Sequence, residues 1–162
     1  MRKLAVNIVW IKRDIRTLDH ESFHAAESKN IPYLPVYIFD NDLIDYPDTS
    51  DRHLGFIYNS LIDINKKLST FNKEVEILYG PSLDIFKYLI SQYKIENIFS
   101  YQESGIKESW ERDVKVRNFC HENSINWMEF QRDGIIRGIK NRKNWNKNWH
   151  IFMHSEIINN SF

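Results

Sequence analysis

A dense run of ionisable side chains follows the first apolar segment of this chain. Residues 4–11 are mostly apolar, and four of the next five residues are charged: Lys12, Arg13, Asp14 and Arg16. Lysine and arginine bind anionic oxygens, and a carboxylate accepts hydrogen bonds from the N–H groups of a ligand. In α/β proteins, ligands bind beyond the carboxyl ends of the strands, which is where a turn after a first strand lies. This charged turn is therefore a candidate binding site.

A second candidate is Glu103, in the segment Ser100-Tyr101-Gln102-Glu103-Ser104-Gly105 at the expected end of a fourth strand. If the strand order reverses beside the first strand, the first and fourth strands are neighbours, and Glu103 shares a crevice with the charged turn. Two interpretations are equally open. The charged groups hold a ligand, or they form a structural ion pair beside a helix cap.

The segment His20-Glu21-Ser22-Phe23-His24 matches the H-E-x-x-H pattern of zinc metalloproteases. Two histidines four residues apart on a helix can hold zinc while the glutamate activates a water molecule. Here, however, the pattern opens the helix after the first strand, whereas a metalloprotease places it on a central helix with a further ligand downstream. We therefore interpret these residues as exposed polar side chains in a first helical turn, and we predict no metal site.

Two other patterns of catalysis or cofactor binding do not fit this chain. Cys120 and His121 are adjacent near the end of an expected helix, and neighbouring residues on a helix do not face each other. Only five glycines occur, and none is grouped after the first strand. We therefore predict neither a Cys–His nucleophilic pair nor a glycine-rich phosphate loop, and no catalytic residue.

The last part of the chain is basic and aromatic. Residues 132–147 contain six lysines and arginines and one acidic residue, Asp133, and Trp145 and Trp149 lie four residues apart. Cations neutralise phosphates and aromatic rings stack on bases, so a nucleic-acid contact is chemically reasonable. Packing of the tryptophans against a neighbouring domain is the favoured alternative, because the apolar residues recur at the spacing of a short amphipathic helix.

Short apolar segments that alternate with helical patterns must position these side chains. Leu54, Ile57, Leu61, Ile64 and Leu68 recur at the spacing of one helix face, and Gly80-Pro81-Ser82 marks a turn before another helix. The segments rich in valine, isoleucine and aromatic residues are typical of parallel strands covered on both faces. Strands are predicted at residues 4–11, 33–39, 74–79, 97–101 and 126–131. We predict an α/β fold, a Rossmann-like three-layer α/β/α arrangement with a five-stranded parallel sheet.

Composition limits the class of protein. The chain has 162 residues, which suits one domain, and its 22 basic residues balance its 22 acidic ones, so overall charge predicts no polyanionic partner. The single cysteine, Cys120, fits a reducing compartment, and we expect a cytoplasmic location. No apolar run approaches the roughly 20 residues of a membrane span. Met1-Arg2-Lys3 precedes a strand rather than a signal peptide.

Residues along most of the chain resemble the DNA photolyase and cryptochrome family. The segment Trp10-Ile11-Lys12-Arg13-Asp14-Ile15-Arg16-Thr17-Leu18-Asp19-His20 is similar to the family's first-strand pattern, W-x-[RK]-x-D-L-R-x-x-D-[NH]. Further resemblance follows in the same order as in the family, at Pro35–Phe39, Ser50–His53, Tyr58–Leu61, Ser100–Glu103, Glu111–Asp113, Gly134–Arg137 and Trp145.

The resemblance implies two domains with different functions. Residues 1–131 would form the family's N-terminal α/β domain, and residues 132–162 the start of the connection to a C-terminal helical domain. In the family that second domain binds FAD and damaged DNA, and it contains the tryptophans that reduce the flavin. We therefore expect a piece of a longer protein that takes part in light-driven repair of pyrimidine dimers but does not repair DNA by itself, and Trp145 and Trp149 are not expected to be redox groups.

The family's N-terminal domain often holds an antenna chromophore, a reduced folate or a deazaflavin. By matched positions, Lys12, Arg13, Asp14 and Glu103 correspond to the deazaflavin side of that pocket, and Glu108 lies in the region of the carboxylate that binds the folate. Two alternatives remain: the α/β domain of a signalling cryptochrome, and a stand-alone nucleotide-binding domain of similar topology, which would need a glycine loop.

Overall fold

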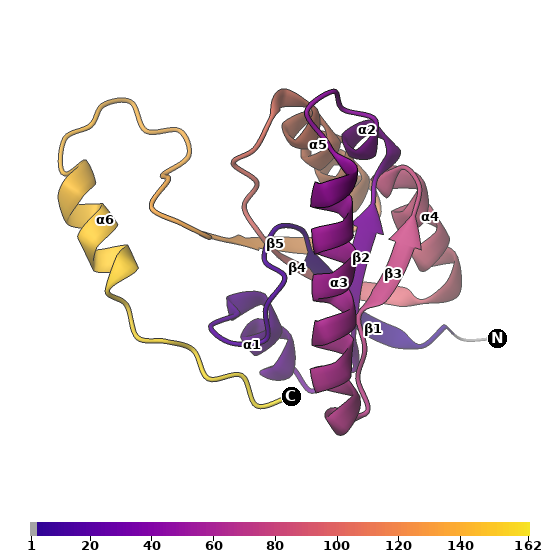
Figure 1. Cartoon of the computed structure of the whole chain (residues 1–162). Coiled ribbons are helices and arrows are strands. Elements are labelled where there is room, and N and C mark those ends of the chain that lie inside the picture. The colour runs from indigo at the N-terminus through magenta and orange to yellow at the C-terminus, as the bar shows by residue number, and fades with distance from the viewer. Residues whose placement is uncertain (1–2) are drawn as a thin grey trace.

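A computed structural model describes residues 3–162 and contains one five-stranded sheet (Figure 1). Every neighbouring pair of strands is parallel, and their order is β3-β2-β1-β4-β5. This confirms the predicted α/β fold, and the strand order reverses beside the first strand, which is the condition for Glu103 to lie near the charged turn. Met1 and Arg2, on which part of the signal-peptide prediction rests, lie outside the described residues. The strands are β1 (Ala5–Ile11), β2 (Tyr33–Phe39), β3 (Glu76–Tyr79), β4 (Lys94–Tyr101) and β5 (Asn126–Phe130).

Helices cover both faces of the sheet and so form the predicted three layers. One core lies under α4 and α5, where Phe86 and Val116 meet alternate residues of β1 such as Ile8. The other core lies under α1 and α3, where Phe23 and Leu61 meet the remaining residues of β1. The helices are α1 (Glu21–Glu27), α2 (Asn41–Ile44), α3 (Asp51–Leu68), η1 (Ser69–Phe71), α4 (Ser82–Gln92), α5 (Lys107–Glu122) and α6 (Trp145–Met153).

Local sequence accounts for most of these boundaries. Helix α3 begins after Ser50, whose hydroxyl accepts from the backbone N–H of His53, and it buries Leu61, Ile64 and Leu68 on one face. Strand β4 begins at Lys94, three residues before the prediction, because the Lys94 N–H donates to the Leu4 carbonyl at 2.8 Å. The first residues of β4 include polar ones, so the start of this strand cannot be recognised from apolar runs in the sequence.

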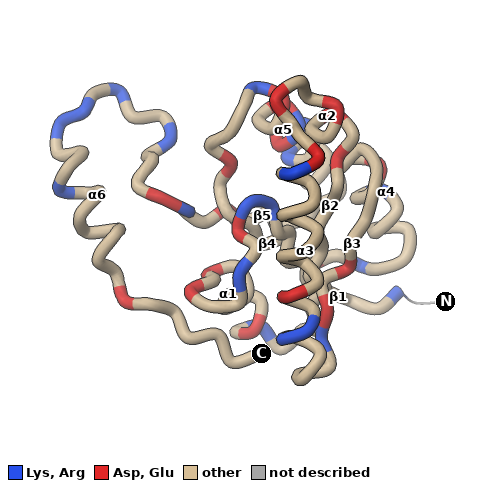
Figure 2. The backbone as a smooth tube through the Cα atoms, in the orientation of Figure 1, with Lys and Arg blue, Asp and Glu red and all other residues tan. Residues whose placement is uncertain are grey.

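The chain after β5 forms an arm that leaves the sheet and returns to it (Figure 1). Helix α6 confirms the predicted short helix, and its Trp145 and Trp149 rings lie 6.5 Å apart. Lysines and arginines follow one another along the segment before α6 (Figure 2). The last residues run back to α1. Within residues 3–162 no helix combines the length and the apolar character that crossing a membrane requires.

Candidate functional site

The charged turn and Glu103 meet at the carboxyl edge of the sheet. Strands β1 and β4 are paired, with Val9 opposite Phe99. The helix after β1 covers one face of the sheet and the helix after β4 covers the other, so the two connecting loops part at this edge. Such a switch point is the usual ligand crevice of an open α/β sheet. The topology therefore places both candidates where a ligand site is expected.

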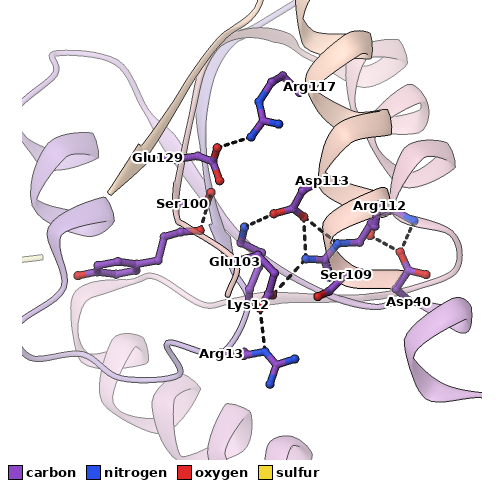
Figure 3. Close-up of polar contacts among 12 residues, drawn as sticks. Lys12, Arg13, Asp40, Ser100, Glu103, Ser109, Arg112, Asp113, Arg117 and Glu129 are labelled. Atoms are coloured by element: carbon purple, nitrogen blue, oxygen red, sulfur yellow. Dashed lines mark hydrogen bonds and ion pairs between the residues drawn. The ribbon is translucent and has the colours of Figure 1, made fainter. Parts of the chain in front are cut away.

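Five side chains at this edge form a network of alternating charge (Figure 3). Lys12 Nζ lies 2.8 Å from Asp113 Oδ2, and Arg112 donates to Asp113 Oδ1 at 2.8 and 3.0 Å. Arg112 also reaches Glu103 at 3.5 Å, and Arg13 Nε lies 3.1 Å from Glu103 Oε1. Three cations and two carboxylates alternate, so each buried charge has an opposite neighbour.

Burial separates the inner part of this network from its outer part. The side chains of Lys12, Asp113 and Glu103 are 4%, 2% and 2% exposed, whereas that of Arg13 is 52% exposed. Burial lowers the pKa of Lys12, and the nearby Asp113 carboxylate opposes that change. Lys12 Nζ also lies 4.8 Å from the centre of the Trp10 ring, which Arg112 approaches to 4.9 Å. Lys12 is thus held inside the protein, and Arg13 is the cation that a ligand can reach.

Asp14 turns away from this network. Its Oδ2 lies 2.8 Å from Nε2 of His20, and its Oδ1 accepts from the Lys12 backbone N–H at 3.0 Å. Since Nδ1 of His20 accepts from the Phe23 N–H, the ring of a neutral His20 carries its proton on Nε2, facing Asp14. Burial favours a higher pKa for Asp14, but the hydrogen bonds from the His20 ring and the Lys12 backbone, together with the charge of Lys12, outweigh burial and hold that pKa below its ordinary value.

The structure therefore divides the four predicted site residues. Arg13 and Glu103 meet as expected, Lys12 binds Asp113 in the interior, and Asp14 binds His20. The structural ion network of the second interpretation is present, and its Arg13 end faces solvent. Ligand binding by these residues stays a prediction.

The interpretation of His20 as an exposed residue is wrong. Its side chain is fully buried, and it caps α1 rather than lying within the helix. His24 is exposed, so the two rings do not share an environment. Among residues 3–162 no group of three or more metal-ligating side chains comes together. The H-E-x-x-H pattern here thus serves a helix cap and a buried ion pair.

A shallow groove lies beside Glu103, between the loop after β4 and the arm. The backbone at Gly105 covers the Arg13–Glu103 pair closely, since a Cβ there would lie 2.5 Å from Arg13 and 2.7 Å from Glu103. Trp110 is 56% exposed and offers a flat aromatic wall. Glu108 belongs to a different hollow. The groove is lined by Glu103, Ser104, Gly105, Lys107, Trp110 and Arg137, among others.

Two further predictions about single residues can be placed in the structure. Cys120 is buried in the core under α5, and burial raises the pKa of its thiol to about 12. Trp149 packs against Gly134, where a Cβ would lie 1.9 Å from its ring. Cys120 is thus a core residue. The ring of one tryptophan of the arm, Trp149, is partly covered by another residue of the arm.

Arg112 and Asp113 complete the charged network, although the sequence alone did not single them out as site residues. They lie inside α5, where an Arg-Asp pair is normally taken as part of an exposed face. The helix as a whole has few apolar residues, so its buried side was hard to recognise. The family resemblance at Glu111–Asp113 was the one available indication.

Comparison with known proteins agrees with this fold. A family model described as DNA photolyase matches residues 7–144, most of the chain. The chain belongs to the DNA photolyase family. The match begins at the third residue of β1 and ends just before α6, so it includes nearly all of the sheet and the first part of the arm.

Curated relatives of this photolyase-family chain are named as cryptochromes. A cryptochrome DASH of Arabidopsis thaliana is 28% identical over 109 residues, which cover 64% of this chain and 19% of that protein. Cryptochrome-1 of Drosophila melanogaster is 26% identical over 136 residues, covering 80% of this chain and 25% of that protein. The chain therefore spans about a quarter or less of the length of these relatives.

Solved structures share the fold at low identity. An archaeal photolyase from Sulfolobus tokodaii, described with two FAD molecules and a novel light-harvesting cofactor, has a TM-score of 0.74 and 22% identity, covering 90% of this chain and 34% of that one. A Synechocystis cryptochrome has a TM-score of 0.74 and 14% identity, covering 99% of this chain and 37% of that one.

Proposed function

We propose that this chain is the N-terminal domain of a photolyase-like protein that splits pyrimidine dimers in DNA with light. The family match and the shared fold support the assignment, and the relatives' greater length supports a further domain. In this proposal residues 1–131 form the α/β domain, and residues 132–162 begin the connection to a helical domain that binds FAD and damaged DNA. The chain by itself would then repair no DNA.

We further propose that the groove beside Glu103 holds an antenna chromophore, a deazaflavin or a reduced folate. The observation that carries this proposal is a buried carboxylate that lines the groove: Glu103 Oε1 pairs with the Arg13 cation at 3.1 Å and accepts no further hydrogen bond within residues 3–162. A chromophore N–H can satisfy that oxygen, and anionic groups can meet Arg13 or Arg137. Trp110 can cover the ring face.

The chromophore, when bound, would absorb light and pass the excitation to the flavin. The residues of this chain bind and orient it. In this arrangement Lys12 and Asp14 do not contact the chromophore and instead position the residues that do. Lys12 holds Asp113 in place, and Asp14 holds the turn that carries Arg13. The ion pairs with Arg13 and Arg112 fix the position of the Glu103 carboxylate, as an acceptor of fixed direction requires.

Absorption spectroscopy of the purified chain, mixed with deazaflavin or with reduced folate, tests the antenna proposal. We expect a bound pigment, and a loss of affinity of about tenfold in Glu103→Gln, because one charge-assisted hydrogen bond is weakened. Glu122→Gln is the matched control, since it changes an exposed carboxylate outside the groove. Failure to bind either pigment, or equal losses in both variants, would refute the proposed site.

A signalling cryptochrome is the second candidate, because the curated relatives carry that name. Repair of pyrimidine dimers by the full-length protein under blue light separates the two, since a purely signalling protein leaves the dimers intact. A stand-alone nucleotide-binding domain is less well supported, because the described residues contain no glycine-rich loop after β1. We propose a cytoplasmic location, which a fluorescent fusion tests directly.

A further inference from the structure

The last residues of the chain are docked on the turn that follows β1. The Asp19 N–H donates to the Ile158 carbonyl at 2.9 Å, and the Ile158 N–H donates to Asp19 Oδ1 at 3.2 Å. These two bonds join segments 139 residues apart in the sequence. Figure 1 shows the end of the chain beside α1 after its excursion through α6. We call residues 158–162 the strap.

The side chain of Asn160 makes the most specific contact of the strap. Its Oδ1 accepts from the His20 N–H at 3.0 Å, and its Nδ2 donates to the His20 carbonyl at 2.9 Å. One amide side chain therefore satisfies both backbone groups of a residue whose own ring is fully buried against Asp14. Only an amide of this length offers a donor and an acceptor in that arrangement.

An aromatic contact completes the docking two residues further on. The Phe162 ring lies 5.1 Å from the Phe23 ring of α1 and 5.8 Å from the Phe71 ring of η1. Such edge and tilted contacts add stabilisation beyond the apolar area that they bury. Burial alternates along the strap: Ile158, Asn160 and Phe162 are partly buried, and Ser161 is exposed. Asn159, between Ile158 and Asn160, is exposed.

The docked turn has a backbone conformation that needs support. Asp19 has a φ of 55°, in the left-handed region that residues other than glycine rarely adopt. Its carbonyl accepts two hydrogen bonds from the Arg16 guanidinium, at 3.0 and 2.7 Å, and the strap holds its N–H and its carboxylate. The same turn carries Asp14, whose carboxylate anchors the Lys12 backbone.

We propose that the strap positions the turn between Lys12 and His20, so that the arm and the charged site are mechanically coupled. Displacement of α6 by a binding partner would pull the strap from Asp19 and His20 and loosen the turn that presents Arg13. Conversely, a ligand that orders the turn would favour the docked strap. This inference concerns the fold itself and holds whether or not a chromophore binds.

Hydrogen exchange of the full chain, followed by mass spectrometry, tests the coupling. In Asn160→Ala, peptides covering residues 12–24 should exchange about tenfold faster than in the parent chain, because two hydrogen bonds to His20 are lost. Asn159→Ala is the matched control, since Asn159 is a neighbouring asparagine with an exposed side chain, and it should leave exchange unchanged. Peptides from β2 should not respond in either variant.

Phe162→Ala provides an independent variant, because it removes the aromatic contact and keeps the Asn160 bonds. It should speed exchange in the same peptides by several-fold, and circular dichroism should show that both variants remain folded. The proposal is overturned if residues 12–24 exchange equally in Asn160→Ala, Phe162→Ala and Asn159→Ala. Chromophore titration is a separate measurement, so failure of the antenna proposal leaves this result interpretable.

Discussion

Removal of the charge on Asp113 is the sharpest test of the network at the sheet edge. Asp113→Asn keeps the size and shape of the side chain, so no cavity forms. It leaves the buried Lys12 without its partner at 2.8 Å and weakens the two bonds to Arg112. Breaking a buried ion pair by removing one partner costs about 3–5 kcal/mol. For a domain of this size, that loss lowers the melting temperature by roughly 10 °C.

The assay is reversible urea unfolding followed by circular dichroism, with Asp84→Asn as the control. Asp84 pairs with Lys87 at 3.0 Å, and both side chains are more than half exposed. An exposed pair of the same geometry contributes at most about 1 kcal/mol, so this variant should stay close to the parent chain. The contrast between the two aspartates isolates burial as the cause.

A double variant checks that the cost of Asp113→Asn comes from a buried Lys12 without an ion-pair partner. In a Lys12→Met background, Asp113→Asn should cost clearly less than it does alone, because the unpaired ammonium group is gone and Arg112 still has Glu103. The reasoning fails if Asp113→Asn costs less than about 1 kcal/mol, or if the loss is the same with and without Lys12.

Three further predictions concern other buried groups. The pKa of Asp14 is held below its ordinary value, so its contribution to stability is present above about pH 4 and is lost as the pH falls through its folded-state pKa. Acid unfolding curves of the parent chain and Asp14→Asn should therefore converge at low pH, and a constant gap would contradict the pairing with His20. Burial raises the pKa of the Cys120 thiol to about 12, so Ellman's reagent at pH 8 should label it only after unfolding, and rapid labelling of the folded chain would show an accessible thiol. Gly134→Ala should displace the Trp149 ring, which a red shift in tryptophan fluorescence detects, whereas Gly55→Ala, with open space around it and no positive φ, should leave the tryptophan emission unchanged.

Periodicity in the sequence was sufficient for the architecture. Apolar runs such as 33–39 and the stripe from Leu54 to Leu68 contain enough information to locate the elements, because each must bury a continuous face. Strand β4 shows where this reasoning fails, since its first residues are polar and take their place by pairing with β1. No particular residue specifies the strand order; the reversal beside β1 was only assumed from the usual form of open α/β sheets, and the structure contains it.

The location of the candidate site was also predictable, but the partners of its side chains were not. A turn after β1 and a carboxylate after β4 must meet once those strands pair, and Arg13 and Glu103 do so. Sequence spacing cannot tell which way a side chain points when several opposite charges are within reach. Lys12 therefore pairs with Asp113, which lies in a distant helix. Asp14 pairs with His20, which we interpreted from the sequence as exposed.

The sequence by itself thus determined the α/β class, the family and the edge of the sheet at which charged groups gather. These properties depend on local patterns and on chain order, which are written directly in the residues. Only the tertiary structure decided which charges are buried, that the buried His20 side chain caps α1, and that the strap returns to Asp19. Those outcomes depend on contacts between segments that are distant in the sequence. Burying a charge costs free energy unless an oppositely charged partner from another segment lies beside it.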